Sequence, residues 1–441
     1  MLGFRIKNNL FDIIGSMNHK NEVYWYTLKK PNIKKLTSDL SADIAIIGGG
    51  MAGLTCAQSL SGRGYRIVLL EKDFCGSGAS GKSSGFITPD SELELSHLIR
   101  RFGAKGAKEL WDFVTSGVEH IRKTILDNKI DCDYQIQDSF FVANTKQAFK
   151  KIISEHNSRQ SSGYESTLSE KENLETLINS QDYEGGVKYG GTFGINAYLY
   201  CQKLKEILEK QGVHLYEDTE AVSLTNEGVK TRYNFVYAKK IIICLDRFSP
   251  SLGVLKKEIY SAQTFLTVSS PLSLEKIKSI FPKERLMVWD SDLIYKYYRL
   301  TGDDRLLFGG GSLLYTYIPF ERQNSPMILR NFRKYIQKKL GITIDFEYIW
   351  SGLIGVTKDF LPVAGRDRQY NNAYYIAGSA GLPWAAALGN LIAEAVESDI
   401  NLGGNLFDRH RKYPISGVLQ KFISKPIAFS LSHGIVKYFH K

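Results

Sequence analysis

The sequence predicts an α/β protein in which alternating stretches of the chain build a mostly parallel sheet and an antiparallel sheet. Three observations support this fold class. An apolar run passes through three glycines into a helical pattern at 42–53. A second run at 240–245 is apolar on both faces, which is typical of a covered strand in a parallel sheet. The alternation at 133–143, and again between 262 and 308, indicates antiparallel strands.

The glycine bend at the first apolar run has the form of a dinucleotide-binding turn. Gly48 allows the chain to leave the strand sharply, Gly50 leaves room for a pyrophosphate, and Gly53 lets the helix pack close to the sheet. The helix expected at 51–61 directs unpaired N–H groups toward phosphates. The next strand ends at Glu71, about 20 residues after the first glycine, where an acid meets ribose hydroxyls. The sequence therefore predicts a Rossmann-like domain whose ligand has a free 2′-hydroxyl, with FAD and NAD both open.

The remaining elements follow from hydrophobic periodicity. A loop of small residues at 74–86 is long enough to indicate a ligand-binding loop. The pattern predicts two helices within 91–129, interrupted near Gly103 and Gly106, further helices at 146–156, 196–210 and 325–340, and strands at 133–143, 213–216, 221–225, 229–231, 240–245, 262–269, 286–289, 294–300 and 305–308.

A chain of 441 residues is longer than the chains that usually fold around a single hydrophobic core, so two interleaved domains are expected. The expected divisions are an N-terminal extension at 1–41, a discontinuous nucleotide-binding domain at 42–130, 192–255 and 345–400, a substrate domain at 131–191 and 256–344, and a basic tail at 401–441.

Composition narrows the class of protein. Hydrophobic content of 43% and charged content of 23% are those of a soluble globule. The five cysteines are scattered and the histidines show no metal-ligand spacing, so neither disulfides nor a metal site is predicted, and a reducing, cytoplasmic location is expected. No stretch has the length of apolar sequence that spans a membrane. The net charge of +11 is spread along the chain and does not by itself indicate nucleic acid.

The tail at 409–441 carries basic residues among regularly spaced apolar ones. Pro426 is expected to divide it into two helical pieces. The sequence leaves two interpretations open: the pieces pack on the body or on a partner subunit, or they lie on an anionic membrane surface.

A second bend near the C-terminus has the same order of strand, glycine turn and helix as the first. The strand at 374–377 leads through Gly378 and Gly381 into a helix expected at 385–396. A helix N-terminus at this place would offer positive partial charge to a reduced, anionic flavin. The alternative is a tight turn that merely closes the sheet.

Together, the motifs resemble the FAD-dependent oxidoreductases of the D-amino-acid/glycine oxidase superfamily, in particular the branch of gamma-glutamylputrescine oxidase-like proteins. Four segments carry the resemblance: Tyr24-Trp25 with 42–53, the loop at 78–82, the segment 297–311 and the segment 350–393. They span most of the chain.

The resemblance implies a GR2-type flavoprotein with non-covalent FAD between the two domains. By motif position, it assigns Gly48, Gly50, Met51, Ala52 and Gly53 to the pyrophosphate, Glu71 with neighbouring Lys72 to the ribose, Ala79, Ser80, Gly81 and Lys82 to the flavin side, Val222 to adenine, and Gly352, Gly381 and Leu382 to the isoalloxazine.

The sequence departs from the family pattern at three places near the flavin. Ser83-Ser84-Gly85 stands where relatives often have Asn-Gly-Gly, and Gly381-Leu382-Pro383-Trp384 replaces a smaller turn. Asn196-Ala197 stands where the family has a proline after the central loop. These departures leave the substrate, and the choice between oxidase and dehydrogenase, open.

The predicted activity is hydride transfer from an amine or amino acid to flavin, giving an imine that hydrolyses, with O2 or a quinone-type carrier as the electron acceptor. Tyr298, Arg299 and Trp384 are the candidate substrate-binding residues; Arg299 is suited to hold a carboxylate. Two alternatives remain: a flavoenzyme acting on modified tRNA, and a flavin-binding protein without turnover.

Overall fold

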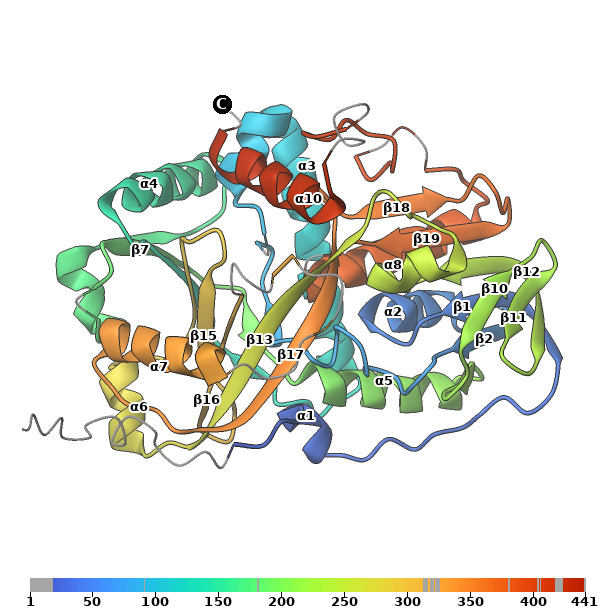
Figure 1. The fold of residues 1–441 in the computed structure, drawn as a ribbon, viewed down its shortest axis with the longest axis horizontal. Helices are drawn as coiled ribbons and strands as arrows, with labels where there is room; N and C mark the ends of the chain where they lie inside the picture. Colours follow the sequence, from blue (N-terminus) through green and yellow to red (C-terminus); the bar gives the residue numbers. More distant parts are fainter. Residues whose placement is uncertain are drawn as a thin grey trace, which may run out of the picture.

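The computed structural model describes residues 19–90, 92–180, 182–311, 316–317, 321, 326–379, 381–402, 404, 406–416 and 423–439. Two eight-stranded sheets stand beside each other (Figure 1). The α/β architecture agrees with the fold class predicted from the sequence, including the antiparallel character of the second sheet.

The first sheet has a parallel centre in the order β12-β1-β2-β9. The end of β12 also pairs in parallel with β19, while its beginning pairs antiparallel with β11, which in turn pairs antiparallel with β10. The strands of this sheet are β1 (Leu40–Ile47), β2 (Ile67–Leu70), β9 (His214–Tyr216), β10 (Ala221–Leu224), β11 (Gly228–Thr231), β12 (Phe235–Ile243), β18 (Val363–Arg366) and β19 (Ala373–Ala377).

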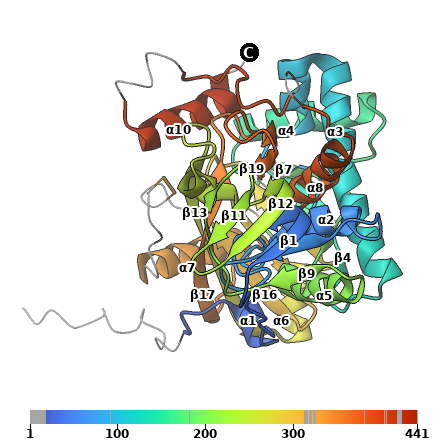
Figure 2. The ribbon, with the colours of Figure 1, turned by 90° about the vertical axis from the view of Figure 1, so that its right-hand side faces the viewer.

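Both faces of this sheet are covered, which explains the continuous apolar runs. Ile44 and Ile46 of β1 pack toward α2 (Met51–Leu60), α3 (Leu95–Asp127), α5 (Ala197–Lys210) and α8 (Leu382–Glu397), while Ala45 and Ile47 pack into a separate cluster on the opposite face. Figure 2 shows α2 and α8 on the same side of the sheet. Consecutive residues of a strand point to opposite faces, so both must be apolar.

The second sheet runs in the order β17-β13-β16-β15-β14-β5-β7-β6, and all its pairs are antiparallel except β14 with β5. Its strands are β5 (Asp138–Val142), β6 (Thr167–Glu170), β7 (Gly185–Tyr189), β13 (Tyr260–Pro271), β14 (Leu286–Asp290), β15 (Lys296–Leu300), β16 (Arg305–Gly310) and β17 (Phe346–Val356).

The long strands β13 and β17 lie between the two halves of the molecule (Figure 1). β17 was assigned from the sequence to the nucleotide-binding domain, which was expected to resume at residue 345. The structure instead pairs it with β13 from Tyr260↔Val356 to Ser269↔Phe346, so the chain re-enters the first sheet only at β18.

The remaining elements connect or cover the sheets. A small third sheet pairs β8 with both β3 and β4. The helices and strands outside the two large sheets that have not yet been named are α1 (Tyr24–Thr27), β3 (Phe86–Ile87), β4 (Gln135–Ile136), α4 (Lys146–Ser161), η1 (Lys171–Thr176), β8 (Phe193–Gly194), η2 (Asp246–Leu252), α6 (Leu274–Ile280), α7 (Pro326–Leu340), α10 (Lys425–Gly434) and η3 (Ile435–Phe439).

Local sequence signals account for several boundaries. Gly103 adopts a left-handed φ of 72° and kinks α3, at one of the two glycines where the sequence predicted an interruption. Asn196 caps α5 by accepting hydrogen bonds from the backbone of Tyr198 and Leu199, each at 3.1 Å. The strand expected at 133–143 is divided into β4 and β5.

Candidate functional site

The bend between β1 and α2 requires glycine at two positions. Gly48 has a φ of 108°, and a Cβ there would lie 2.4 Å from the carbonyl oxygen of Cys244. A Cβ on Gly53 would lie 1.9 Å from the carbonyl oxygen of Gly48. The N-cap residue Gly50 has no side chain to cap the first turn of α2; the N–H of Met51 donates to Ser80, and the N–H groups that follow it are suited to an external anion.

Glu71 closes this bend from the end of β2. Its Oε2 accepts a hydrogen bond from the Gly49 backbone at 2.7 Å, and its Oε1 accepts one from the Asp73 backbone at 3.0 Å. Burial raises the pKa of this carboxyl, and the N–H bonds from Asp73 and Gly49 oppose that effect. The acid is therefore placed at the mouth of the bend, where the sequence predicts ribose binding.

A groove continues beyond Glu71 along the edge of the first sheet. Lys72, Asp73, Thr219 and Glu220 are among its lining residues. Val222, expected to meet adenine through its backbone, lies two residues farther on in β10 with 42% of its surface exposed, and it is not among the groove-lining residues. Residues 218–220, which lie just before β10, therefore border the groove.

The loop after β2 is joined directly to the glycine bend. Ser80 accepts a hydrogen bond at its Oγ from the backbone N–H of Met51, the first residue of α2, at 2.9 Å. A Cβ on Gly81 would lie 2.0 Å from the carbonyl oxygen of Gly76, so the turn of the loop also needs glycine. The loop and the helix N-terminus are therefore one unit.

Three long side chains hold the carbonyl groups of this loop. Trp350 Nε1 donates to the carbonyl of Lys82 at 2.9 Å, and Trp25 Nε1 donates to the carbonyl of Ser83 at 3.0 Å. The Arg299 guanidinium donates through Nε to the carbonyl oxygen of Ser84 at 2.9 Å. Buried carbonyl groups need such partners, so the loop is held in one conformation.

The two glycine bends meet on one side of the first sheet. Both begin at the carboxyl ends of parallel strands, and the helices that follow, α2 and α8, pack against each other. Ser59 of α2 donates to Asn390 of α8 at 2.6 Å, and Cys56 contacts the carbonyl of Gly389 at 3.3 Å. In the second bend, Gly378 and Gly381 have left-handed φ values of 70° and 129°.

A cavity between the two sheets brings together most of the residues assigned to the flavin side, although Ser80 and Gly81 are not among its lining residues. It encloses about 1380 Å³ of space not filled by atoms, part of it open to solvent. Its walls include Ala79, Lys82, Gly352, Gly381 and Leu382. A Cβ on Gly352 would meet only the Cβ of Lys82, at 3.8 Å, so this glycine leaves an open space beside the loop. The loop and the second bend therefore border the same open space.

The substrate residues expected from the sequence lie elsewhere. Tyr298 is buried between Phe281 and Phe308, and Trp384 packs against Phe113. Arg299 is fully buried and donates to backbone carbonyls. None of the three is among the residues that line the described walls of the cavity, and their contact with substrate stays a prediction.

Other side chains of the second sheet face the cavity. Tyr295 and Tyr297 line it, together with Trp289 of β14. Side chains two residues apart in a strand point to the same face, so Tyr297 lies on the same face as Arg299 and could have been named as a candidate from the sequence. Glu92 and His433 also line the cavity, but they come from distant segments that no local pattern connects with it.

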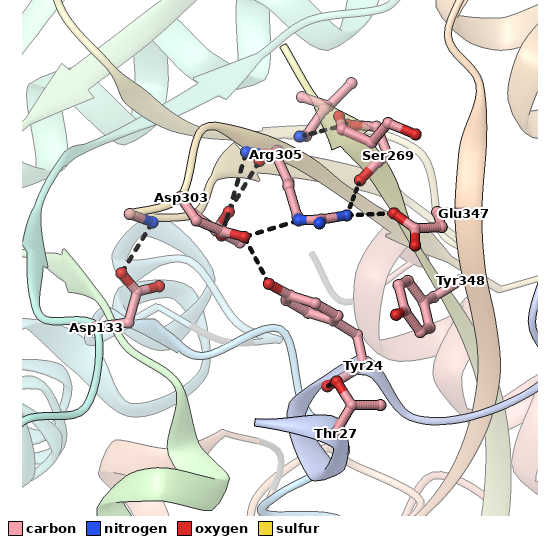
Figure 3. Close-up of polar contacts among 12 residues, drawn as sticks. Tyr24, Thr27, Asp133, Ser269, Asp303, Arg305, Glu347 and Tyr348 are labelled. Atoms are coloured by element: carbon pink, nitrogen blue, oxygen red, sulfur yellow. Dashed lines mark hydrogen bonds and ion pairs between the residues drawn. The ribbon is translucent and has the colours of Figure 1, made fainter. Parts of the chain in front are cut away.

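A polar cluster outside the cavity joins two of the motif segments (Figure 3). Tyr24 donates to Asp303 at 2.6 Å, and Arg305 donates to Asp303 at 2.7 Å and to Glu347 at 2.6 Å. Burial raises the pKa of Asp303, but hydrogen bonds from Thr301, Tyr24 and Arg305 outweigh it and lower the pKa below its ordinary value. This cluster fixes α1 against the second sheet, and with it Trp25 against the loop.

The cysteines are free thiols. Cys75 lies next to the loop but is fully buried, and burial raises the pKa of its thiol well above the ordinary value. A buried, protonated thiol of this kind is a packing residue.

Three cationic side chains of the described tail form ion pairs or hydrogen bonds with the body of the protein. Arg411 donates to both oxygens of Asp359, at 2.8 Å each. Lys425 donates to the carbonyl oxygen of Ile259 at 2.6 Å, and Lys437 lies 3.9 Å from Glu92. The first expected helical piece includes residues 417–422, which lie outside the described residues; α10 begins at Lys425 and packs on β13. The described part of the tail therefore packs on the body.

A search of the described helices finds none with enough length and apolar character to cross a bilayer.

The comparisons with known proteins agree with this geometry. The family model described as FAD dependent oxidoreductase, abbreviated DAO, matches residues 43–395. Gamma-glutamylputrescine oxidoreductase of Escherichia coli is 28% identical over 376 residues, covering 82% of this chain and 85% of that protein. The probable oxidoreductase OrdL of Haemophilus influenzae is 26% identical with the same coverage. The crystal structure of L-proline dehydrogenase from P. horikoshii superposes with a TM-score of 0.71 at 19% identity, covering 85% of this chain and 98% of that one.

The family model matches most of the chain, and five of the residues assigned to the flavin side border one cavity between the two sheets. The chain thus belongs to the DAO family of FAD-dependent oxidoreductases, an enzyme family with FAD as cofactor that acts on amines or amino acids.

Proposed function

We propose that this enzyme oxidises the carbon next to the nitrogen of a primary or secondary amine, forming an imine that water then hydrolyses. The observation that carries the proposal is the single cavity into which the loop at 79–82, Gly352 and the second bend all open, opposite aromatic side chains of the second sheet. Bound FAD supplies the acceptor for the hydride.

The first bend, the loop and Glu71 are proposed to hold the cofactor. The N-terminus of α2 faces the pyrophosphate, Glu71 meets the ribose after exchanging its contact with Gly49, and Lys82 and Gly352 border the ring. Lys82 lies 3.5 Å from Glu321, which also accepts a hydrogen bond from Ser351 at 2.8 Å. This arrangement holds the lysine chain at the cavity wall.

The cavity wall is proposed to orient the amine and keep water away from the reacting carbon. Leu266, Ile354 and Val356 provide apolar surface, and the aromatic rings of Trp289 and Tyr297 lie opposite the loop. A preformed apolar site of this kind favours a neutral amine over its ammonium form, and the neutral amine is the form that can give up a hydride.

An anaerobic reduction experiment tests the proposal. The protein is reconstituted with FAD and mixed with a panel of primary amines, secondary amines and amino acids, and the yellow flavin absorbance is followed. We expect at least one amine to bleach the flavin, and a subsequent addition of O2 or a quinone identifies the electron acceptor. Retention of the absorbance with the whole panel would refute amine turnover and favour a flavin-binding protein without it.

A further inference from the structure

The C-terminal helix α10 forms part of the cavity, although it lies outside the segment that the family model matches. It lies at the top of the molecule in both overall views, above the long strands β13 and β17 (Figures 1 and 2). Phe429 and His433 face inward and are buried, whereas Ile427 and Leu431 are 51% and 52% exposed. One face of the helix is therefore part of the protein interior.

His433 is held in one orientation at the cavity wall. Its ring stacks on Phe360, with centroids 3.9 Å apart and an interplanar angle of 24°. Nε2 lies 2.6 Å from the carbonyl oxygen of Thr357, and Nδ1 lies 2.6 Å from the hydroxyl of Tyr317, which also lines the cavity. A carbonyl can only accept, so Nε2 carries the hydrogen and Nδ1 accepts from Tyr317. The imidazole thus fixes a second wall residue.

The imidazole is uncharged in this position. Burial lowers the pKa of His433 to about 4, and the bond to Thr357 offsets only part of that effect. Lys437 and Asp359 are the charged groups that act on it, with opposite signs. At neutral pH the helix therefore presents a flat, neutral ring to the cavity.

Lys437 follows His433 by four residues in the chain and lies where two cavities adjoin. It lies 3.9 Å from Glu92, whose other oxygen accepts a hydrogen bond from the hydroxyl of Tyr295 at 2.9 Å. Glu92 and Tyr295 line both the main cavity and an adjoining cavity, which we call the outer cavity and which Lys437 also lines. The main and outer cavities share these residues, so Lys437 and Glu92 stand between them.

Ion pairs and hydrogen bonds on both sides of this helix hold the tail in place. Arg411 pairs with Asp359 in the turn after β17, and Lys358 of the same turn donates to the carbonyl of Ile415 at 2.6 Å. Lys425, at the start of α10, donates to the carbonyl of Ile259. The position of His433 is thus set by the body of the protein as well as by its own contacts.

We propose that His433 and Lys437 of the tail determine which amines this enzyme accepts. His433 limits the length of the group that extends from the reacting nitrogen, and Lys437 neutralises Glu92, so that a second ammonium group on the substrate is not favoured. This inference rests on the proposed function, because His433 lines the main cavity and Lys437 pairs with Glu92, which also lines it.

The length limit is tested with butylamine, hexylamine and octylamine on the FAD-loaded full chain. Binding is measured from the change in flavin absorbance without oxygen, and reduction is measured separately. In His433→Ala, the affinity ratio of octylamine to butylamine is expected to rise roughly tenfold, the effect of burying about two more methylene groups. His433→Phe retains a ring of similar size, and the ratio should stay near that of the wild type.

The matched control for length is Leu431→Ala, a truncation on the exposed face of the same helix. It should leave the ratio unchanged. A ratio that rises equally in His433→Ala and Leu431→Ala, or equally in His433→Ala and His433→Phe, would overturn the length limit. If His433→Ala does not fold, retention of the wild-type ratio by His433→Phe and the charge test below decide the proposal.

The charge effect is tested by comparing hexamethylenediamine with hexylamine. In Lys437→Met the preference for the diamine is expected to rise roughly fivefold, because Glu92 loses its cationic neighbour. Added salt should reduce that gain. An unchanged preference would overturn the role of Lys437.

Failure of the proposed function gives a different result. A wild-type holoenzyme whose flavin is neither perturbed nor reduced by any amine of these series contradicts both proposals. A wild type that responds to amines, with variants whose selectivity is unchanged, contradicts only the role of the tail.

Discussion

The two walls of the cavity are built by different means. The wall on the cofactor side consists of backbone turns in which glycines permit left-handed φ values, as at Gly85 and Gly381, and these turns adjoin the close-packed bend at Gly48 and Gly53. The opposite wall consists of side chains from distant segments, such as Tyr297, Glu92 and His433. A backbone turn leaves a local signature in the sequence, whereas a wall of side chains does not. The difference explains which half of the site could be anticipated.

The sharpest test of the backbone wall is Gly53→Ala. The added Cβ would lie 1.9 Å from the carbonyl oxygen of Gly48, so the bend or the helix must move. We expect FAD affinity to fall by roughly a hundredfold or more, or the domain not to fold, because pyrophosphate binding depends on this geometry. Flavin content after purification is the measurement. Gly78→Ala is the control, because a Cβ there meets nothing within 4 Å.

The ion pair between Arg411 and Asp359, which anchors the tail, provides the next largest expected effect, a loss of stability. Arg411→Met leaves the fully buried Asp359 with Arg101 as its remaining ion-pair partner. We expect the free energy of unfolding to fall by roughly 3–5 kcal/mol, since an incompletely paired buried charge is costly. Urea unfolding measures it. Lys239→Ala, which breaks a pair with Asp43 and has an 80% exposed side chain, should cost less than about 1 kcal/mol. Equal effects would show that the tail is only loosely attached.

The same anchor predicts a dependence on acid. Burial by itself raises the pKa of Asp359, but Arg411 and then Arg101 outweigh it and lower the pKa from 3.8 to about 2. A carboxyl with a lowered folded-state pKa stabilises the protein above its unfolded pKa and loses that contribution as the pH falls. Roughly 2 kcal/mol should therefore be lost between about pH 4 and pH 2.

Unfolding at a series of pH values measures this loss. Asp359→Asn should remove that part of the profile. An identical acid profile in the wild type and in Asp359→Asn would show that the pair does not stabilise the tail.

Arg299 connects the two walls, and its substitution separates loop-holding from substrate binding. Arg299→Lys cannot reproduce the bonds to the carbonyls of Ser84 and Ile195 together. We expect FAD binding to weaken roughly tenfold, about 1.4 kcal/mol, with little change in the preference between amines and amino acids. Flavin fluorescence titration measures affinity, and exposed Arg330→Lys is the control. A selective loss of amino acids would restore Arg299 as a carboxylate-binding residue.

Trp384 gives the smallest expected effect. It packs against Phe113 and Phe407 behind the second bend. Trp384→Phe should lower the free energy of unfolding by roughly 1–2 kcal/mol through lost packing and leave amine selectivity unchanged. Thermal unfolding and the amine series measure the two quantities. A change in selectivity at constant stability would place this residue at the substrate after all.

Most of the first sheet could be predicted because each signal is local. The apolar runs of β1 and β12 reflect burial on both faces, and the glycines between β1 and α2 reflect the geometry of one turn. Residues 345–356 were assigned to the nucleotide-binding domain, whereas β17 pairs with β13 of the second sheet, because a segment's own sequence does not reveal its hydrogen-bonding partner. Strand partners depend on contacts between distant segments.

The site was predicted in part for the same reason. Ala79, Lys82, Gly352, Gly381 and Leu382 border one cavity. Arg299 shares its face of β15 with Tyr297 but is covered by the loop, and only the folded chain shows this difference in surroundings. His433 lies in a tail whose basic and apolar residues were compatible with a membrane surface as well as with the body.

By itself, the sequence determined the fold class, the glycine bend after β1 and the helix that follows it, because backbone conformation at glycine and the periodicity of burial are properties of neighbouring residues. The tertiary structure decided which side chains face the cavity, which cations of the tail are already paired, and that α10 contributes a wall residue to the cavity. Those outcomes depend on contacts between residues such as His433, Tyr317 and Thr357, which are brought together only when the chain has folded.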